Sequence, residues 1–288
     1  MTTGWNWFSI NVTDNNMSLN NVLGSVEGSA TYIKDQTSFA EFVPGLGWLG
    51  QLTDIDPKSL YKMTMDQSGW YNWSGLKTDE TSPIDLSAGW NWIGYLPQDD
   101  MAIDNALASI GADGIYIKNQ STFAQYVAPL QSWLGQLGEM KTLDGYMLQM
   151  ANASSLTYVA GDRSEVTPQM VEDSRDTPAW EVVASNYEFT GSITSIVSIG
   201  DDVNDVLGVF VDGECRGTSI GLDYTSQLGH VFYTPTIYSN TAAGEVMTFQ
   251  FYDASSDVVY DITGEITFEA DMNLGGFTAP HEFVVLLD

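Results

Sequence analysis

The residues that most often perform catalysis are scarce in this chain and are not spaced for it. The two histidines, His230 and His281, have no metal-binding spacing such as H-E-x-x-H around them. The single cysteine, Cys215, lies in a run of β-type residues, which favours a packed thiol and excludes an internal disulfide. The sequence contains neither a G-x-S-x-G elbow nor a Gly-Lys-Ser/Thr phosphate loop. It therefore predicts a protein that is not an enzyme.

One acidic segment has the residue types of a calcium site. "DDVNDV" brings together four oxygen-bearing side chains, Asp201, Asp202, Asn204 and Asp205. Oxygen ligands at such spacing could hold Ca²⁺, although the glycine and the distal glutamate of an EF-hand are missing. A solvated acidic turn is the alternative, and we favour it. No other cofactor is expected.

Aromatic residues are the better candidates for binding a ligand. "GWYNWSG" carries Trp70, Tyr71 and Trp73, and each of two "WLGQL" segments carries one more tryptophan, Trp48 and Trp133. Aromatic rings beside Asn, Gln and Asp are suited to stacking on sugar rings. Packing of these rings in a core or between the repeats is the alternative, and we favour it.

A single basic residue stands among the many acids between Asp176 and Asp288. This residue, Arg216, follows Glu214 by two positions, so both side chains point to the same face of a strand. We expect a structural ion pair rather than a ligand contact.

The net charge limits the classes of partner that the protein can bind. The 288 residues include 38 acidic and 9 basic side chains, a formal net charge of −29. The electric field of such a charge repels nucleic acid and anionic membranes. The sequence also contains no run of about 18 apolar residues, so no membrane-spanning helix is predicted. The negative charge suits an extracellular or cell-surface protein in salt. No signal peptide precedes Trp5, so we expect a longer parent chain with flanking domains.

The chain repeats itself at an offset of 84 or 85 residues. "GWNW" occurs at 4–7 and 89–92, "YIKDQTSFAEFV" at 32–43 matches "YIKNQSTFAQYV" at 116–127, and "WLGQL" occurs at 48–52 and 133–137. This pattern predicts a tandem duplication, with repeat 1 at 4–88 and repeat 2 at 89–161.

Each repeat is expected to be a small mixed α/β module. Apolar residues at helical spacing predict a short helix after "GWNW", from Leu19 to Val26 and from Ile103 to Ile110. Ser18 is the expected cap of the first helix, and Asp99 or Asp100 that of the second. "SGWYNWSG" (68–75) and "SSLTYVAG" (154–161) are expected to be the last strands. Trp5 and Trp90 are interpreted as core anchors, and at least one tryptophan of each "GWNW" is expected to be largely buried.

The remaining sequence predicts a linker and a third domain. Residues 162–178, with prolines and acids and little apolar periodicity, are interpreted as the linker. From residue 179 to 288 the pattern alternates with period two, which indicates an all-β sandwich. Asp-Gly in "VDGEC" (211–215) predicts a tight hairpin, and "DASSD" (253–257) predicts a second turn.

Both parts resemble known modules. The "GWN" strand, the helix, "GWLGQL" and "DIDPKSLYKMTM" resemble tandem accessory repeats of large secreted bacterial proteins. "DDVNDVLGVFVDGECRG" and "FQFYDASSDVVYD" resemble an Ig-like accessory sandwich of surface proteins that Bacteroidetes export by type IX secretion. The resemblance implies modules without catalysis. Ser59 and Leu60 depart from the first pattern, where a glycine turn is usual.

These observations predict a β-rich α+β protein of two α/β repeats and an Ig-like sandwich. Its expected role is a non-catalytic extracellular module in adhesion, spacing or carbohydrate binding, with a polysaccharide or a surface protein as partner. The alternative is the accessory part of a secreted glycosidase or peptidase, with catalysis elsewhere or through an unrecognised carboxylate pair.

Overall fold

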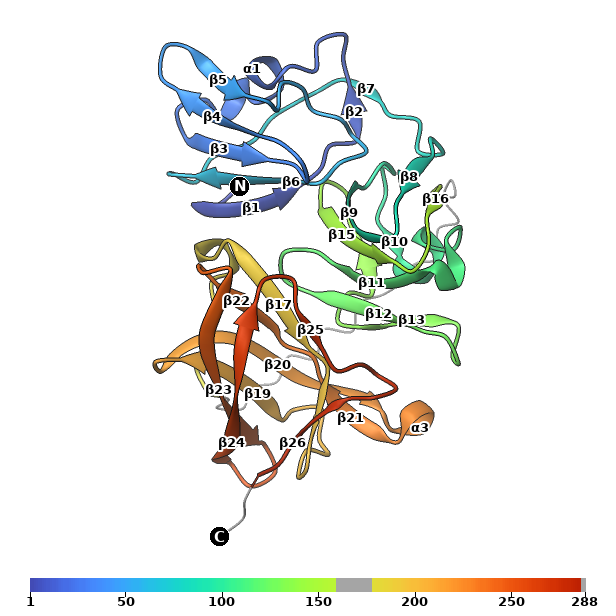
Figure 1. Ribbon diagram of the computed structural model, residues 1–288, viewed down its shortest axis with the longest axis vertical. Coiled ribbons are helices and arrows are strands. Elements are labelled where there is room, and N and C mark those ends of the chain that lie inside the picture. The colour runs from blue at the N-terminus through green and yellow to red at the C-terminus, as the bar shows by residue number, and fades with distance from the viewer. Residues whose placement is uncertain (159–177, 286–288) are drawn as a thin grey trace. The chain divides into compact units, whose positions relative to one another are not determined.

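The computed structural model describes residues 1–158 and 178–285, which fall into two units (Figure 1). Unit 1 contains Met1–Gln120, Ala128–Trp133 and the described chain from Leu137 to Tyr158. Unit 2 contains Ser121–Val127, Leu134–Gln136 and the described chain from Pro178. Strands make up 49% of the chain and helices 8%, which confirms the β-rich class. The predicted linker lies outside the described residues except for its last residue, Pro178.

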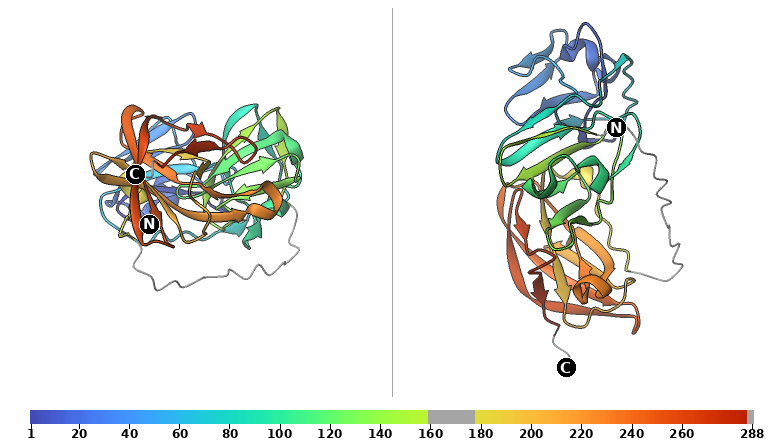
Figure 2. Two further views of the ribbon diagram at one scale, coloured as in Figure 1. Left: turned by 90° about the horizontal axis from the view of Figure 1, so that it is seen from below. Right: turned by 90° about the vertical axis from the view of Figure 1, so that its right-hand side faces the viewer.

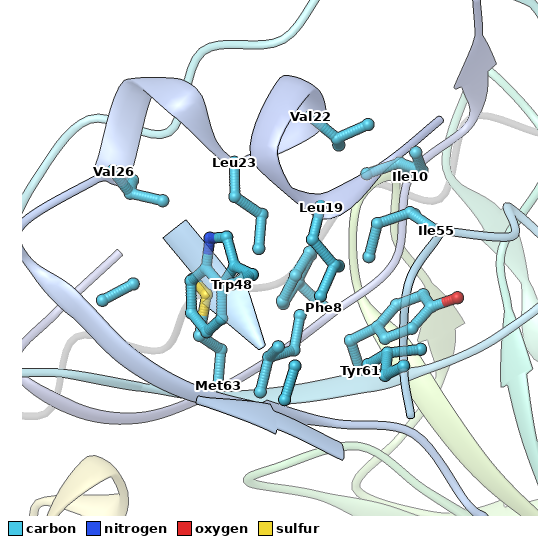
Figure 3. Packing of buried hydrophobic residues seen from close by; sticks show 14 of the residues in the cluster. Phe8, Ile10, Leu19, Val22, Leu23, Val26, Trp48, Ile55, Tyr61 and Met63 are labelled. Carbon is cyan, nitrogen blue, oxygen red and sulfur yellow. The ribbon is translucent and has the colours of Figure 1, made fainter. Parts of the chain in front are cut away.

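Repeat 1 is built on a five-stranded sheet with one face toward a core. Its strand order is β1 (Gly4–Phe8), β6 (Tyr61–Met65), β3 (Ala30–Lys34), β4 (Phe39–Val43) and β5 (Gly47–Gly50). Because side chains alternate along a strand, Phe8 points to the core and Trp5 and Trp7 to the outer face. Figure 3 shows Phe8, Trp48 and Met63 packed beneath the helix residues Leu19 and Leu23.

Repeat 2 has a sheet of the same strand order. It runs β9 (Gly89–Gly94), β15 (Gly145–Met150), β11 (Gly114–Lys118), β12 (Phe123–Val127) and β13 (Ser132–Gly135). Three short two-stranded ladders also belong to unit 1. They pair β2 (Val12–Thr13) with β7 (Leu76–Lys77), β8 (Ile84–Leu86) with β16 (Ser154–Leu156), and β10 (Met101–Ala102) with β14 (Glu139–Met140).

The predicted helix forms in both repeats, but each is one turn long. Helices α1 (Leu19–Val22) and α2 (Ile103–Ala106) are followed by 3₁₀ turns η1 (Gly24–Val26) and η2 (Gly111–Asp113). Ser18 is the N-cap residue of α1, but its side chain makes no capping hydrogen bond. The expected cap of α2 by Asp99 or Asp100 is wrong, because β10 comes between and Ala102 is the N-cap residue. Burial of the apolar stripe therefore stabilises these helices more than capping does.

One predicted strand is absent. Residues 68–75 form a loop, whereas the corresponding part of repeat 2 contributes β16. The loop nevertheless keeps alternating sides, since Tyr71 and Trp73 pack on the core of repeat 1 and Trp70 is exposed.

Unit 2 is sandwich-like. A three-stranded sheet has the order β22 (Thr236–Ser239), β17 (Phe189–Ile193), β25 (Asn273–Leu274). A seven-stranded sheet has the order β24 (Val258–Glu269), β23 (Ala243–Asp253), β19 (Val206–Val211), β20 (Glu214–Tyr224), β21 (His230–Tyr233), β18 (Ser195–Val197), β26 (His281–Phe283). Short helices η3 (Ala184–Asn186) and α3 (Thr225–Leu228) lie outside these sheets. The long β23–β24 hairpin is coloured from orange to red in Figure 2.

Both predicted turns of unit 2 are present. Asp212 and Gly213 join β19 to β20 with φ of 50° and 81°, the left-handed pair that a tight hairpin requires. Residues 254–257 join β23 to β24, with Asp257 at φ 56°. The core beneath contains Leu207, Phe249 and Phe251, each at most 2% exposed. No helix among the described residues is long and apolar enough to cross a membrane.

Candidate functional site

The glycine and the asparagine of "GWNW" shape the start of a strand. Gly4 and Gly89 have φ of 87° and 88°, which only glycine adopts readily. The Asn6 amide donates to the carbonyl oxygens of Thr2 and Gly4 at 2.7 and 2.9 Å. Asn91 makes the equivalent two bonds in repeat 2, at 2.8 and 3.0 Å. These two residues of the motif therefore act in folding.

The second tryptophan of each motif lies at a cluster shared by the two repeats. Trp7 is buried, and Trp92 packs against the same cluster with Leu60 and Met147. The Nζ of Lys62, a buried residue, lies 3.7 Å from the ring centroid of Trp7 and 4.4 Å from that of Trp92. Cation–π contacts of a desolvated ammonium contribute up to about 2 kcal/mol. These rings hold the repeats together and are not presented to a ligand.

The tryptophans of the two motifs differ in burial. Trp7 is 7% exposed, whereas Trp90 and Trp92 are both half-buried. The interpretation of Trp5 as a core anchor is wrong, because it lies half-buried on the outer face of its sheet, whereas the half-buried Trp90 packs against the cluster of Trp7, Leu60 and Met147. Each meets a tyrosine ring edge-on.

Two glutamines join the repeats reciprocally. Gln36 donates to the carbonyl oxygen of Trp90 at 2.8 Å and accepts from the backbone N–H of Trp92 at 2.8 Å. Gln120 makes the equivalent bonds to Trp5 and Trp7 at 2.8 and 3.0 Å. Strands β1 and β9 are edge strands, so these glutamine contacts satisfy backbone groups that no strand pairs. The recurrence of "GWNW" is thus explained by the interface between the repeats.

Trp48 and Trp133 are not available to stack on a ligand. They are 7% and 6% exposed, and Trp48 is part of the core of repeat 1. Their backbone N–H groups donate to Asn20 and Asp104 in the adjacent helices, each at 2.8 Å. The prediction of a binding role for these two rings is wrong, because a sugar ring cannot reach the face of an indole that a core covers.

The loop of repeat 1 divides its three aromatic residues. Tyr71 and Trp73 pack against the core, and burial raises the pKa of the Tyr71 hydroxyl well above 10. Trp70 is 93% exposed. It lines a hollow of about 340 Å³ together with Met1, Ser68 and Gly69. Of the aromatic residues predicted to bind a ligand, Trp70 is the one that the structure presents to solvent.

The acidic segment at 201–205 is organised around one buried carboxylate. Asp205 is 1% exposed and accepts from the N–H of Ala254 at 2.9 Å, from the hydroxyl of Tyr233 at 3.2 Å, and from the N–H groups of Asp201 and Asp202 at 3.4 and 3.2 Å. Burial raises the pKa of Asp205 despite these bonds. The carboxylate oxygens of Asp205 thus accept hydrogen bonds from the protein itself. Oδ1 of Asp202 likewise accepts hydrogen bonds from the backbone N–H and the side-chain amide of Asn204.

Arg216 forms the expected pair with Glu214 and a closer one that the sequence did not indicate. The distance from Nη2 to Glu214 Oε2 is 3.5 Å, whereas Nη1 and Nη2 lie 3.1 and 3.3 Å from the two oxygens of Glu245. The guanidinium also lies 5.0 Å from the ring of Tyr187, whose hydroxyl donates to Glu214 at 2.6 Å. Burial and the carboxylate raise the pKa of Tyr187 to about 12, so it remains a donor. The cluster joins three elements, as a structural role requires.

No catalytic arrangement is visible in the part of the chain that the structure describes. His230 and His281 lie at the starts of strands β21 and β26 and pack edge-on against Phe232 and Phe283. Burial raises the pKa of the Cys215 thiol, which disfavours a reactive thiolate. Within the described residues, no group of three or more His, Cys, Asp or Glu side chains could hold a metal ion.

Comparison with known proteins adds no relative. No protein-family model matches the chain, and neither a curated protein nor a solved structure matches it. The candidate site therefore stands on geometry alone. Ser68 and Gly69, which share the hollow with Trp70, were missed from the sequence, although their place directly before the tryptophan was a usable signal.

Proposed function

We propose that this chain is a non-catalytic module of an extracellular or cell-surface protein that contacts carbohydrate through Trp70. The observation that carries the proposal is the exposure of this indole. A tryptophan is rarely left almost fully in water, because covering its large apolar face is favourable. An exposed indole face is also the surface on which the apolar face of a sugar ring stacks.

The neighbours of Trp70 support a binding role. Tyr71 and Trp73 fix the loop to the core of repeat 1, and Asn72 N–H donates to the Ser25 hydroxyl at 2.9 Å. The loop is thereby ordered before any ligand arrives, which lowers the entropic cost of binding. Repeat 2 has strand β16 in the corresponding part of its sequence, so the exposed tryptophan distinguishes the two copies.

The expected affinity of one such site is low. Stacking on one indole contributes about 1 kcal/mol, so a single module binds weakly and gains strength from further copies or modules in a longer chain. Adhesion to a polysaccharide surface fits this regime. The strong negative charge favours neutral glycans over anionic ones.

Retention on insoluble polysaccharides tests the proposal. We expect the Trp70→Ala variant to be retained about fivefold to tenfold less than the parent, and Trp70→Tyr to be retained almost normally. Leu76→Ala is the matched control, since Leu76 is also exposed, at 79%, and is not aromatic. Equal retention of the parent and Trp70→Ala would leave spacing or protein adhesion as the function.

A further inference from the structure

A second aromatic surface lies on the larger sheet of unit 2. A groove of about 480 Å³ is lined by the aromatic residues Trp180 and Phe210 and by the polar residues Thr248, Gln250 and Asp261. Its volume falls within the range of small-molecule sites and is large enough for one or two sugar rings. All five residues belong to unit 2, and none is near Trp70 in the sequence.

The register of the strands explains why these residues meet. Phe210 pairs with Thr248 across β19 and β23, and Gln250 pairs with Asp261 across β23 and β24. Alternation places these side chains on the face opposite the core residues Phe249 and Ile262. The groove is therefore the solvent side of the sheet and not a defect in its packing.

A glycine makes room for the indole. A Cβ atom at Gly208 would lie 2.7 Å from Trp180 Cε3 and 2.8 Å from Phe210 Cε2. The two rings thus come together over Gly208, with centroids 5.3 Å apart and planes at 80°. Trp180 remains half-buried, so part of the indole is accessible from the groove.

The polar side is already ordered. The Gln250 amide donates to Asp261 Oδ1 at 2.9 Å, which fixes both side chains beside the rings. Beyond that bond, Gln250 has an amide oxygen and Asp261 has a second carboxylate oxygen that can accept from hydroxyl groups. The hydroxyl of Thr248, an exposed residue, donates to the Phe210 carbonyl oxygen at 3.4 Å and can accept from a ligand hydroxyl.

The charge of the surroundings selects among ligands. Arg216 is the only Lys or Arg after residue 178, and its guanidinium is bound by Glu245 and Glu214. A phosphate, a sulfated sugar or a uronate would meet Asp261 without a compensating cation. A neutral ring with hydroxyls at its edge matches both sides of the groove.

We propose that this groove binds one pyranose ring of a neutral oligosaccharide, with the accessible part of Trp180 against the ring and Thr248, Gln250 and Asp261 on its hydroxyls, while the buried Phe210 packs against the indole. The inference rests on the proposed function in naming carbohydrate as the ligand. It uses a different unit and different residues, so the chain would carry two separate sites.

Calorimetric titration of the whole chain tests this site. The probes are neutral hexasaccharides of glucose, xylose, mannose and N-acetylglucosamine. Two charged probes are added for comparison: a hexauronate, which is anionic, and hexalysine, a cationic peptide that would bind if the groove recognised charge and not sugar. We expect at least one neutral probe to bind, Trp180→Ala to weaken that binding about tenfold, and Trp180→Phe to weaken it less. Trp70→Ala should remove the other site and leave this one unchanged, so the two proposals can fail separately.

A second variant guards against unfolding. If Trp180→Ala lowers the melting temperature of unit 2, the pair Thr248→Val and Gln250→Ala alters only the groove's polar side and should also weaken binding about tenfold. Asp261→Asn should leave neutral-sugar binding within about threefold and improve hexauronate binding. Absence of binding by every neutral probe, binding that these variants leave unchanged, or tighter binding of hexalysine than of any neutral sugar would each overturn the proposal.

Discussion

Replacement of Asp205 by alanine should destabilise unit 2 more than any other change in the 201–205 segment. The carboxylate accepts from the Ala254 N–H at 2.9 Å and from the Tyr233 hydroxyl at 3.2 Å, besides the N–H groups of Asp201 and Asp202 at 3.4 and 3.2 Å. Hydrogen bonds to a charged acceptor contribute about 1.5–3 kcal/mol each. The bonds from Ala254 and Tyr233 alone therefore predict a loss of about 3–6 kcal/mol, which for a domain of this size corresponds to a fall of roughly 10–20 °C in Tm.

Calorimetric melting of the full chain measures this loss, and Asp201→Asn is its control. Asp201 lies in the same segment and is exposed, so its variant removes the same charge without a buried acceptor. A free energy of unfolding for Asp205→Ala within about 1 kcal/mol of that of the control would refute the structural role of the carboxylate.

The same scans with millimolar calcium test the calcium prediction. A carboxylate engaged by protein donors predicts no rise in Tm, and a rise that Asp205→Ala abolishes would show that the segment binds the ion.

Two further predictions concern the glutamine contacts and a histidine. Gln120→Ala should lower the free energy of unfolding by about 1–2 kcal/mol and Gln36→Ala by less than about 1 kcal/mol, because the bonds of Gln120 are partly buried and those of Gln36 are exposed. Urea unfolding of both variants measures these losses, and a larger loss for Gln36→Ala would contradict the prediction. Burial lowers the pKa of His281 below 6.5, so the unfolded chain gains its proton first and stability should fall as pH drops below about 6.5. His281→Gln should reduce the difference in urea midpoint between about pH 7 and about pH 5.5, and an unchanged difference would assign the pH dependence to other groups.

Local patterns predicted the features that depend on neighbours in sequence. The positive φ of Asp212 and Gly213 follows from the Asp-Gly pair between two apolar runs. The helical stripe from Leu19 correctly indicated a helix, although tertiary packing ends it after one turn. Where one residue and its immediate neighbours decide the conformation, the sequence was sufficient.

Features that depend on distant partners could not be predicted in the same way. Arg216 was assigned to Glu214, two residues away, whereas its closer partner, Glu245, comes from another strand. Trp180 meets Phe210 only because Gly208 leaves room and the strand register brings Gln250 alongside. The residues next to Trp48 and Trp133 in the sequence are those that an exposed, ligand-binding tryptophan could also have. The two rings are buried by residues that are distant in the sequence.

The glutamine contacts also show that the two repeats of unit 1 meet through equivalent surfaces. Each repeat offers the other one glutamine and one edge strand, and receives the same in return. A backbone bond from Gly94 N–H to the Lys58 oxygen at 2.9 Å has its counterpart from Ser9 to Leu143 at 2.9 Å. Such reciprocity is the rule of an isologous dimer, in which one surface patch meets its own copy about a two-fold axis. Unit 1 thus has the interface of a homodimer within one chain. Lys62, whose counterpart in the second copy is Met147, is a position at which the two halves have become different.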